Sequence, residues 1–461
     1  MVDVAGAVDR FFRISERGTT VGTELKGGII TFLAMVYILV VNPSIISNVP
    51  TAAEFGFQAL FTSTALAAII SCLLMGLYAR FPIALAPGMG VNAFLAFTVC
   101  LEMGFTYVQG LMVVFVSGVG FFIVSVTGWR TKILDSIPLS MKCAITAGIG
   151  FFIAIVGLFN SGIIAHGDGS ALAMGKLSDP GVILSMVCLF ITLPLWYLKV
   201  WWAVIAGMAI TWIIGIVMGL CGITSEFGLI PVWDAGSFVS HPDLTLVFAV
   251  FTDFEMFDSS MILAFVVSFL SLLVVDLFDT TGTLIAVGDA ANMTDETGHI
   301  TDGEKVLDVD SIATMAGAVV GTSTTTSFIE STTGIDAGAR TGLMPIVVGF
   351  LFIIALFFSG FFATFTSACI VGALVMVGIL MIKKVKLIDW DDPVSCGMAF
   401  MTIFMIGLSG SITVGIGAGI LVYVIGMIVT GKAREISKVL WILFVLFMGY
   451  LMFNQFLMPY F

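Results

Sequence analysis

Residues 322–338, TSTTTSFIESTTGIDAG, are rich in hydroxyl side chains and glycine and contain two acidic residues. The sequence around them is apolar and long enough to span a membrane. A second stretch of this kind is 85–97, LAPGMGVNAFLAF, in which Pro87 and two glycines interrupt a helix. The Thr-rich run 322–327 favours extended backbone that leads into a short helix. Because non-helical backbone at bilayer depth is tolerated only where it lines a cavity or is buried in protein, these two breaks predict a functional centre.

The composition of the whole chain excludes a soluble globular protein. Of its 461 residues, 59% are hydrophobic and 10% are charged, and the mean hydropathy is +1.15. Soluble domains carry roughly 25% charged residues. Apolar runs near the roughly 20 residues that a helix needs to span a bilayer recur from end to end. The chain is therefore predicted to be an all-α polytopic protein of the lipid bilayer.

Several other kinds of site are not indicated. The seven cysteines are scattered without a CxxC pair and are interpreted as packing residues, so no metal site is expected. The chain has no GxxxxGK(S/T) phosphate-binding loop, and hence no ATP-driven motor of its own. The net charge of −12 lies mostly in loops, and nothing suggests nucleic-acid binding or a bound cofactor.

The apolar runs predict fourteen spans in order along the chain. They are 28–47, 58–78, 84–99, 107–127, 138–158, 181–198, 201–220, 260–288, 309–321, 325–338, 342–362, 366–382, 396–408 and 411–430. A further apolar segment at 439–460, within the C-terminal 437–461, is predicted either to cross the membrane or to lie along its interface.

The basic residues predict how these spans are oriented, because Lys and Arg are enriched in cytoplasmic loops. With residues 1–26 in the cytoplasm, the spans put 17 of the 18 basic residues on the cytoplasmic side and only Lys176 outside. The charge distribution therefore supports the span count, and it predicts a cytoplasmic N-terminus in a plasma-membrane protein.

Fourteen spans divide into two halves of seven with opposite orientation, 27–220 and 260–430. Inverted repeats of this kind build many secondary transporters, which bind substrate near the membrane midplane between discontinuous helices. The third and tenth spans, which carry the two interrupted stretches, occupy matching places in the halves. The likeness of Gly90–Ala93 (GVNA) to Gly334–Ala337 (GIDA) supports the repeat.

Two carboxylates lie at membrane depth beside small and hydroxyl side chains: Glu330 and, within 273–287 (LVVDLFDTTGTLIAV), Asp279. An ionised side chain at that depth is costly, so such residues mark substrate or ion pathways by default. A carboxylate in a low-dielectric pocket also takes up a proton more readily and can carry it together with a ligand. The alternative is that both are satisfied polar anchors between helices. Asp276, one turn before Asp279, is open between a cavity role and the capping of a neighbouring backbone.

At these residues the chain resembles a known family. LAPGMGVNAF (85–94), DLFDTTGTL (276–284) and SFIESTTGIDAGARTG (327–342) are closely similar to signatures of the AzgA-like branch of nucleobase:cation symporters, the adenine, guanine and hypoxanthine permeases. The opening TELKGGIITFLAMVYILVVNP (23–43) is similar to the first span of that branch, and the likeness covers about residues 15–430. The more distant uracil and xanthine permeases share the architecture but not these sequence motifs.

The resemblance implies a uracil-permease-like fold, with a core domain (spans 1–4 and 8–11) and a gate domain (spans 5–7 and 12–14). Spans 3 and 10 would each contain a short strand, and the purine would bind between them and the eighth span. By motif, Asp279 and Glu330 match substrate-binding acidic positions, and Asn92 matches a polar position of the third span. The predicted site is completed by the substrate contacts Gly90, Phe328 and Thr280 and by the supporting residues Asp276, Thr283 and Ser331.

The resulting hypothesis is a transporter, not an enzyme, that imports a purine nucleobase with a proton by alternating access. Glu330 and Asp279 would hydrogen-bond the purine, and one of them would carry the coupling proton. Which purine is bound, whether sodium replaces the proton and whether the protein is a homodimer stay open.

Two rivals are weighed against this hypothesis. The first is a transporter of the same architecture for uracil, xanthine or an inorganic anion. An anion carrier should have a basic residue at the interrupted segments, whereas the nearest, Arg340, falls at their inner edge. The second is an integral-membrane enzyme, which should show clustered histidines or paired carboxylates in one helix motif. The three histidines lie in dispersed loops.

Overall fold

The structure is a computed structural model that describes residues 4–127, 136–165, 167, 172–233, 238–252, 261–291, 293 and 303–452. Within these residues the side chains of 4, 5, 277–279, 281, 282, 285, 286, 289, 450 and 451 are not described.

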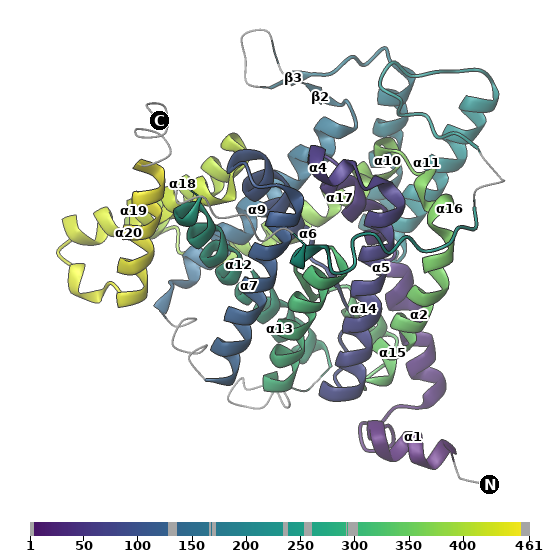
Figure 1. Cartoon of the computed structure of the whole chain (residues 1–461), viewed down its shortest axis with the longest axis horizontal. Coiled ribbons are helices and arrows are strands. Elements are labelled where there is room, and N and C mark those ends of the chain that lie inside the picture. Colours follow the sequence, from purple (N-terminus) through teal and green to yellow (C-terminus); the bar gives the residue numbers. More distant parts are fainter. Residues whose placement is uncertain are drawn as a thin grey trace.

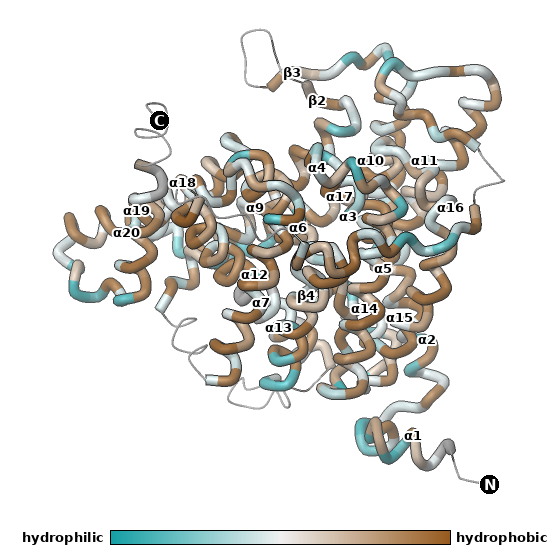
Figure 2. Tube along the Cα trace, viewed as in Figure 1, coloured by the Kyte–Doolittle hydropathy of each residue, from teal (hydrophilic) through white to brown (hydrophobic). Residues whose placement is uncertain are grey.

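Most of the described chain is helical, and its helices are hydrophobic along most of their length, with hydrophilic residues gathered near helix ends and in α1 (Figure 2). In the described residues, nine helical segments are long and apolar enough to cross a membrane. Four shorter apolar helices accompany them: Met89–Glu102, Ile262–Asp276, Pro393–Ser409 and Lys438–Gly449. The prediction of a helical polytopic membrane protein is confirmed.

The elements of the first half, up to Leu220, include ten helices in the described chain. They are α1 (Val4–Phe12), α2 (Val21–Met35), α3 (Ile38–Ile46), α4 (Pro50–Ala53), α5 (Gly56–Leu74), α6 (Met89–Ala93), α7 (Tyr107–Val126), α9 (Leu139–Asn160), α10 (Pro180–Tyr197) and α11 (Ala203–Leu220). The π-helical segments η1 (Met75–Ala79) and η2 (Phe94–Glu102) continue α5 and α6, and the strands are β1 (Leu85–Pro87), β2 (Ile164–Ala165) and β3 (Ala173–Met174).

The second half contains one strand in its described part, β4 (Thr325–Ser327). Its α-helices are α12 (Ile262–Ala290), α13 (Gly303–Val320), α14 (Ser331–Asp336), α15 (Leu343–Ala355), α16 (Ser359–Ala363), α17 (Ser367–Ile382), α18 (Pro393–Ser409), α19 (Ile412–Val429) and α20 (Lys438–Met452). Short 3-10 turns are η4 (Ala249–Phe251), η5 (Leu356–Phe358), η6 (Lys383–Leu387) and η7 (Ala433–Glu435).

The first membrane helix begins earlier than predicted. Helix α2 starts at Val21, inside the segment 1–26 that was expected to be cytoplasmic, because the Thr20 hydroxyl caps it by accepting the Thr23 N–H. The helix is then interrupted: α2 ends at Met35 and α3 begins at Ile38. The interruption places Tyr37 between two helical pieces in the middle of the span.

The two interrupted segments meet each other. β1 pairs antiparallel with β4, with Leu85 opposite Ser327, Ala86 opposite Thr326 and Pro87 opposite Thr325. The ladder extends at both ends, since the Gly88 N–H donates to the Thr324 carbonyl and the Phe328 N–H to the Ala84 carbonyl, each at 3.0 Å. All six strand residues are buried. The short strands expected in these two segments are therefore present, and their backbone is satisfied inside the protein.

The helices form two groups that pack chiefly within themselves. The first group surrounds the β1–β4 pair and contains α2, α3, α5, α7 and α12–α15 (Figure 1). The second group contains α9, α10, α11 and α17–α19, and its most extensive contacts are between α9 and α17 and between α18 and α19. Helix α20 packs on α19 of the second group and on α12 of the first. Residues 453–461 lie outside the described chain, so whether the last segment spans stays open.

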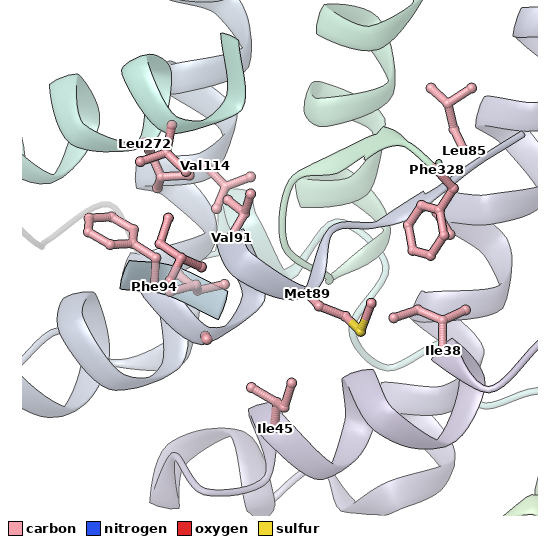
Figure 3. Close-up of a cluster of buried hydrophobic side chains, with 14 of the residues drawn as sticks. Ile38, Ile45, Leu85, Met89, Val91, Phe94, Val114, Leu272 and Phe328 are labelled. Carbon is pink, nitrogen blue, oxygen red and sulfur yellow. The ribbon is translucent and has the colours of Figure 1, made fainter. Parts of the chain in front are cut away.

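Apolar side chains pack around the place where β1 leads into α6. Figure 3 shows the Met89 side chain extending toward Ile38 of α3, with Phe328, which follows β4, on the same side. On the other side of α6, Val91 and Phe94 lie near Val114 of α7 and Leu272 of α12. This packing fixes the first interrupted segment against three neighbouring helices.

Helix α14 lies against α2 through glycines. A Cβ atom added to Gly334 would come within 2.6 Å of the Gly27 carbonyl oxygen, and one added to Gly27 within 2.9 Å of the Gly334 carbonyl oxygen. Backbone atoms cannot give way as a flexible side chain can, so the absence of side chains at both positions sets the distance between these helices. Residue Glu330, which precedes α14, is positioned by this contact.

Candidate functional site

A cavity lies where the two interrupted segments face the second helix group. Its near wall comes from Gly88–Gly90 of the first segment and Thr326–Glu330 of the second, with Thr283 of α12 beside them. Its far wall comes from Thr146 of α9 and from Val377, Leu380, Met381 and Lys384 of α17 and the turn after it. The hollow offers a cavity volume of about 100 Å³, below the roughly 300–1,000 Å³ usual for small-molecule sites, and encloses about 650 Å³ when its open mouth is included.

A second, larger hollow of about 640 Å³ adjoins the first and shares four lining residues with it: Ile329, Glu330, Val377 and Leu380. Aromatic side chains around the α10–α11 connection line it, together with Lys383 and Asp336. Asp336 lies at the C-terminal end of α14, close to the segment after α1, because the Thr19 hydroxyl donates to the Gly338 carbonyl at 3.1 Å. This hollow therefore lies toward the end of the molecule that carries the N-terminus, and Glu330 stands at the boundary between the two hollows.

Glu330 is half-buried and occupies the residue before α14. The Tyr37 hydroxyl donates to its Oε1 at 2.6 Å. Sequence reasoning did not single out Tyr37, although a lone phenol in the run AMVYILVVNP was the available signal. The predicted carboxylate of the second interrupted segment thus lines the cavity and holds a defined partner.

The Asp279 side chain lies outside the described residues, so its contacts are not part of the site as described. Its position in α12 is one helical turn from Thr283, whose side chain lines the cavity. Asp276, a further turn away, is fully buried and accepts a hydrogen bond of 3.1 Å from the Thr314 hydroxyl of α13. Asp276 therefore links α12 to α13 and does not line the cavity.

Thr280 is also buried and does not line the cavity. Its hydroxyl donates to Oδ2 of Asp310 on α13 at 2.5 Å and lies 2.8 Å from the Thr326 hydroxyl of β4. The Ser327 hydroxyl donates to the other oxygen, Oδ1, of Asp310 at 3.1 Å. Asp310 is a buried carboxylate that sequence reasoning missed, since it falls at the start of the predicted span 309–321 where interfacial charges are common.

Of the remaining predicted residues, Gly90, Phe328 and Thr283 line the cavity. Asn92 is fully buried instead, and its Oδ1 accepts a hydrogen bond from the Ser323 hydroxyl; its Nδ2 finds no partner among the described residues. Ser331 is buried too, and its hydroxyl accepts the Ala84 N–H at 2.9 Å. Asn92 and Ser331 each tie one interrupted segment to the other.

The fold also places two charged residues that were not among the predicted site residues. Glu24 lies in the first turn of α2, where it is fully buried and accepts the backbone N–H groups of Arg340 at 2.7 Å and Thr341 at 3.3 Å. The fold also brings Lys384 to the cavity wall from outside the interrupted segments. In the part of the chain that the structure describes, no three His, Cys, Asp or Glu side chains gather as a metal site requires.

The sequence matches known proteins over almost its whole length. A protein-family model described as Permease family matches residues 22–422. The guanine/hypoxanthine permease PbuG of Bacillus subtilis (strain 168) is 39% identical over 453 residues, which cover 96% of this chain and 99% of that protein. The adenine permease AdeQ of Escherichia coli (strain K12) is 36% identical over 433 residues, which cover 94% of this chain and 93% of that protein. These relatives are transporters and not enzymes.

Solved structures share the fold. The transmembrane domain of the cyanobacterial bicarbonate transporter BicA superposes with a TM-score of 0.56 at 15% identity, covering 90% of this chain and 97% of that one. The murine anion transporter Slc26a9 in its inward-facing state gives a TM-score of 0.59 at 12% identity, covering 88% of this chain and 69% of that one. At these identities the likeness concerns the fold alone. By the family match over 22–422 and by its relatives, the chain belongs to the permease family, alongside the guanine/hypoxanthine and adenine permeases that its motifs resemble.

Proposed function

We propose that this protein is a secondary active transporter that carries a purine nucleobase across the plasma membrane together with a proton. The observation that carries the proposal is the position of Glu330: a carboxylate at the wall of a cavity built by two interrupted membrane segments that pair as strands. The similarity to guanine/hypoxanthine and adenine permeases supports a purine as the ligand.

The cavity has the chemistry that a flat heteroaromatic ring requires. A purine edge presents N–H donors and ring or carbonyl acceptors. The Glu330 carboxylate accepts, and the hydroxyls of Thr326, Ser327 and Thr283 on the same wall both donate and accept. The Phe328 ring and the Met89 thioether border the same space and offer apolar contact to the ring faces. Asp279, one turn from Thr283, is the second proposed ligand.

Proton coupling is proposed for the same carboxylates. An ionised side chain at membrane depth is costly, so a carboxylate that binds a proton together with the substrate can cross between the two accessible states as a neutral unit. Glu330 or Asp279 would then release the proton with the purine on the inner side.

The architecture proposed is fourteen spans in two inverted halves, with the first helix group as the core and the second as the gate. The antiparallel pairing of β1 with β4 supports the inverted relation, because each strand comes from a different half of the chain. The packing of helices into two groups supports the division into core and gate. The cavity lies between the groups, where a relative movement would change access to it.

The side of the membrane from which Glu330 can be reached is consistent with alternating access. The hollow that reaches Glu330 opens toward the N-terminal end, which is cytoplasmic in the proposed orientation. Beyond α6 the groups are in contact: the Ile412 N–H at the start of α19 donates to the Thr98 hydroxyl at 3.3 Å. The rings of Phe97 and Phe152 meet edge to face with centroids 5.4 Å apart. We interpret this arrangement as the inward-open state.

Uptake by cells tests the proposal. The protein is expressed in cells that lack their own purine permeases, and uptake of radiolabelled hypoxanthine, guanine and adenine is measured with and without a proton uncoupler. Glu330→Gln should lower uptake at least about 100-fold, as removal of a key charged partner does. The matched control is Glu226→Gln, whose carboxylate is exposed and pairs with Lys176 at 2.7 Å.

Membrane levels of each variant are measured in parallel. If Glu330→Gln takes up all three purines at wild-type rates, the proposed role of Glu330 is wrong. If the wild-type protein takes up no purine, the proposal that a purine is the substrate is wrong. Uptake that resists the uncoupler but follows a sodium gradient would replace the proton with sodium.

One observation favours a second candidate, an anion carrier. Lys384 borders the cavity and offers a positive charge to an anion there. The Glu330 carboxylate on the opposite wall works against an anion, because two like charges in a low-dielectric site repel. Uptake of labelled bicarbonate or sulfate in the same cells decides between the two.

A further inference from the structure

We propose that Tyr37 is a positioning residue for the substrate: its phenol holds the Glu330 carboxylate in the orientation in which that carboxylate accepts a hydrogen bond from a purine N–H. The inference rests on the proposed function, which assigns Glu330 to the ligand. It adds a residue of the first span to a site that the motifs place in spans three, eight and ten.

The geometry of the contact carries the inference. The Tyr37 hydroxyl lies 2.6 Å from Glu330 Oε1, in the short range of about 2.5–2.7 Å that marks an O–H donor to an ionised oxygen. A carboxylate offers about four lone-pair positions, and one phenol occupies one of them. Glu330 lines the cavity, so its carboxylate faces the space in which a ligand would bind.

The backbone around Tyr37 aims the ring. Tyr37 stands in the interruption between α2 and α3, and its side chain is 2% exposed. Phe32 and Val36 border the same apolar hollow as Tyr37, so the ring has aliphatic and aromatic neighbours and its hydroxyl points to the polar side.

The position of Glu330 relative to Tyr37 is fixed by helix packing. Both residues belong to the first helix group, where α2 and α14 approach closely through Gly27 and Gly334. The contact between the phenol and the carboxylate therefore does not depend on how the two helix groups sit relative to each other. Tyr37 would orient Glu330 in both states of the transport cycle.

A comparison with a second buried phenol separates positioning from simple anchoring. Tyr107 is fully buried in the same helix group, and its hydroxyl donates to the backbone carbonyl of Gly321 at 2.8 Å. Tyr107 ties α7 to the chain before β4 and lines none of the hollows described above. Tyr37 donates instead to a side chain at the cavity wall. Tyr37→Phe and Tyr107→Phe thus each remove one buried hydroxyl. Only Tyr37→Phe removes a hydrogen bond to Glu330, the proposed partner of the substrate.

The test uses the full chain, reconstituted in liposomes for uptake and in detergent for unfolding. Tyr37→Phe should raise the KM for hypoxanthine about tenfold, the low end of what loss of a hydrogen bond to a charged group costs. Its maximal rate should stay within about twofold of wild type, since an orienting contact acts on binding. Tyr107→Phe should leave KM within about twofold, as should Tyr78→Phe, whose side chain is 54% exposed.

A substrate-free measurement accompanies uptake. The apparent unfolding midpoints of Tyr37→Phe, Glu330→Gln and the double variant form a mutant cycle, and direct contact predicts that their effects are not additive. If the effects of the two substitutions on the unfolding midpoint are additive, the inference is wrong. It is also wrong if Tyr37→Phe has the KM of an active wild-type protein, and in both cases the proposed function still stands. No purine uptake by the wild type overturns the proposed function, and with it the role of Tyr37 toward a purine.

Discussion

Replacement of Gly334 by Ala should weaken substrate binding without touching the substrate. Gly334 lies in α14, four residues after Glu330, and its Cα faces α2. An added Cβ would lie 2.6 Å from the Gly27 carbonyl oxygen and 3.2 Å from its carbonyl carbon, and it would also press on the Thr31 hydroxyl.

The size of the displacement follows from these distances. Ordinary van der Waals contact starts at 3.4 Å, so relief of the 2.6 Å approach to Gly27 requires a movement of about 0.8 Å. The added Cβ atom and the Gly27 carbonyl oxygen are both held by backbone, and α14 has 6 residues against 15 in α2, so we expect the shorter helix α14 to move. Glu330 moves with it, away from Tyr37 and out of its place at the cavity wall. Misplacement of a binding group by about 1 Å can cost on the order of 100-fold.

Uptake kinetics in proteoliposomes measure this effect. Gly334→Ala should raise the KM for hypoxanthine roughly 10- to 100-fold and should cost about 1–3 kcal/mol of stability through overpacking. Gly22→Ala in α2 is the matched control, because its Cβ would meet only the Thr20 hydroxyl at 3.9 Å. A wild-type KM in Gly334→Ala, with the protein folded in the membrane, would refute the link from glycine packing to the carboxylate.

Three further predictions concern other residues. Asp310→Ala should lower stability by about 3 kcal/mol, because the hydroxyls of Thr280 and Ser327 lose a charged acceptor; an unfolding midpoint in detergent equal to that of wild type would contradict this. Lys384→Met should leave purine uptake within about tenfold of wild type, whereas a complete loss with intact membrane levels would favour an anion as the substrate. Hydrogen bonds from Ser395 hold the pKa of Asp392, the cap of α18, below its ordinary value of 3.8. Its stabilising effect of about 0.5 kcal/mol is thus present above that pH and lost as the pH falls below it. Unfolding midpoints from pH 6 to about pH 3 should therefore fall more in wild type than in Asp392→Ala; parallel curves would contradict the assignment.

Much of the fold follows from hydropathy and from helix breakers. Long apolar runs predict helices, and Pro87 with its neighbouring glycines and the run 322–327 predict where two of them are interrupted. The strands β1 and β4 lie at those places. The start of α2 at Val21 was missed, because a polar first turn is indistinguishable from a loop until the partners of Glu24, which are backbone N–H groups of Arg340 and Thr341, are known.

The motif likeness between the halves has a different register from the strands. GVNA at Gly90 and GIDA at Gly334 are 244 residues apart. The strand pair is centred on Ala86 opposite Thr326, so a twofold relation centred there equates residues 240 apart. The difference is four residues, about one helical turn. Four-residue similarity can locate the interrupted segments but cannot set their register, which depends on backbone hydrogen bonds between strands.

Four of the residues predicted for the site lie together. Glu330, Gly90, Phe328 and Thr283 line one cavity, because helix breakers and intramembrane charge signal where the backbone opens. Asn92 and Thr280 are polar residues in the same motifs, yet they are buried and bond to Ser323 and to Asp310 and Thr326.

Three residues that contact the predicted site residues or line the cavity, Tyr37, Asp310 and Lys384, lie outside the motifs from which the site was predicted. Tyr37 lies between α2 and α3, Asp310 in α13 and Lys384 after α17. Sequence spacing carries no information about side chains that only tertiary packing brings together, so none of the three was predicted to contribute to the site.

A structure of the protein with hypoxanthine bound at saturating concentration tests the central claim most directly. The account predicts density for a flat ring between Gly88–Gly90 and Phe328–Glu330, with a ring nitrogen within about 3 Å of the Glu330 carboxylate and the Tyr37 hydroxyl still on the other side of that group. Density only among the tryptophans of the neighbouring hollow, or an unfilled cavity beside Glu330 when transport is saturated, would contradict it.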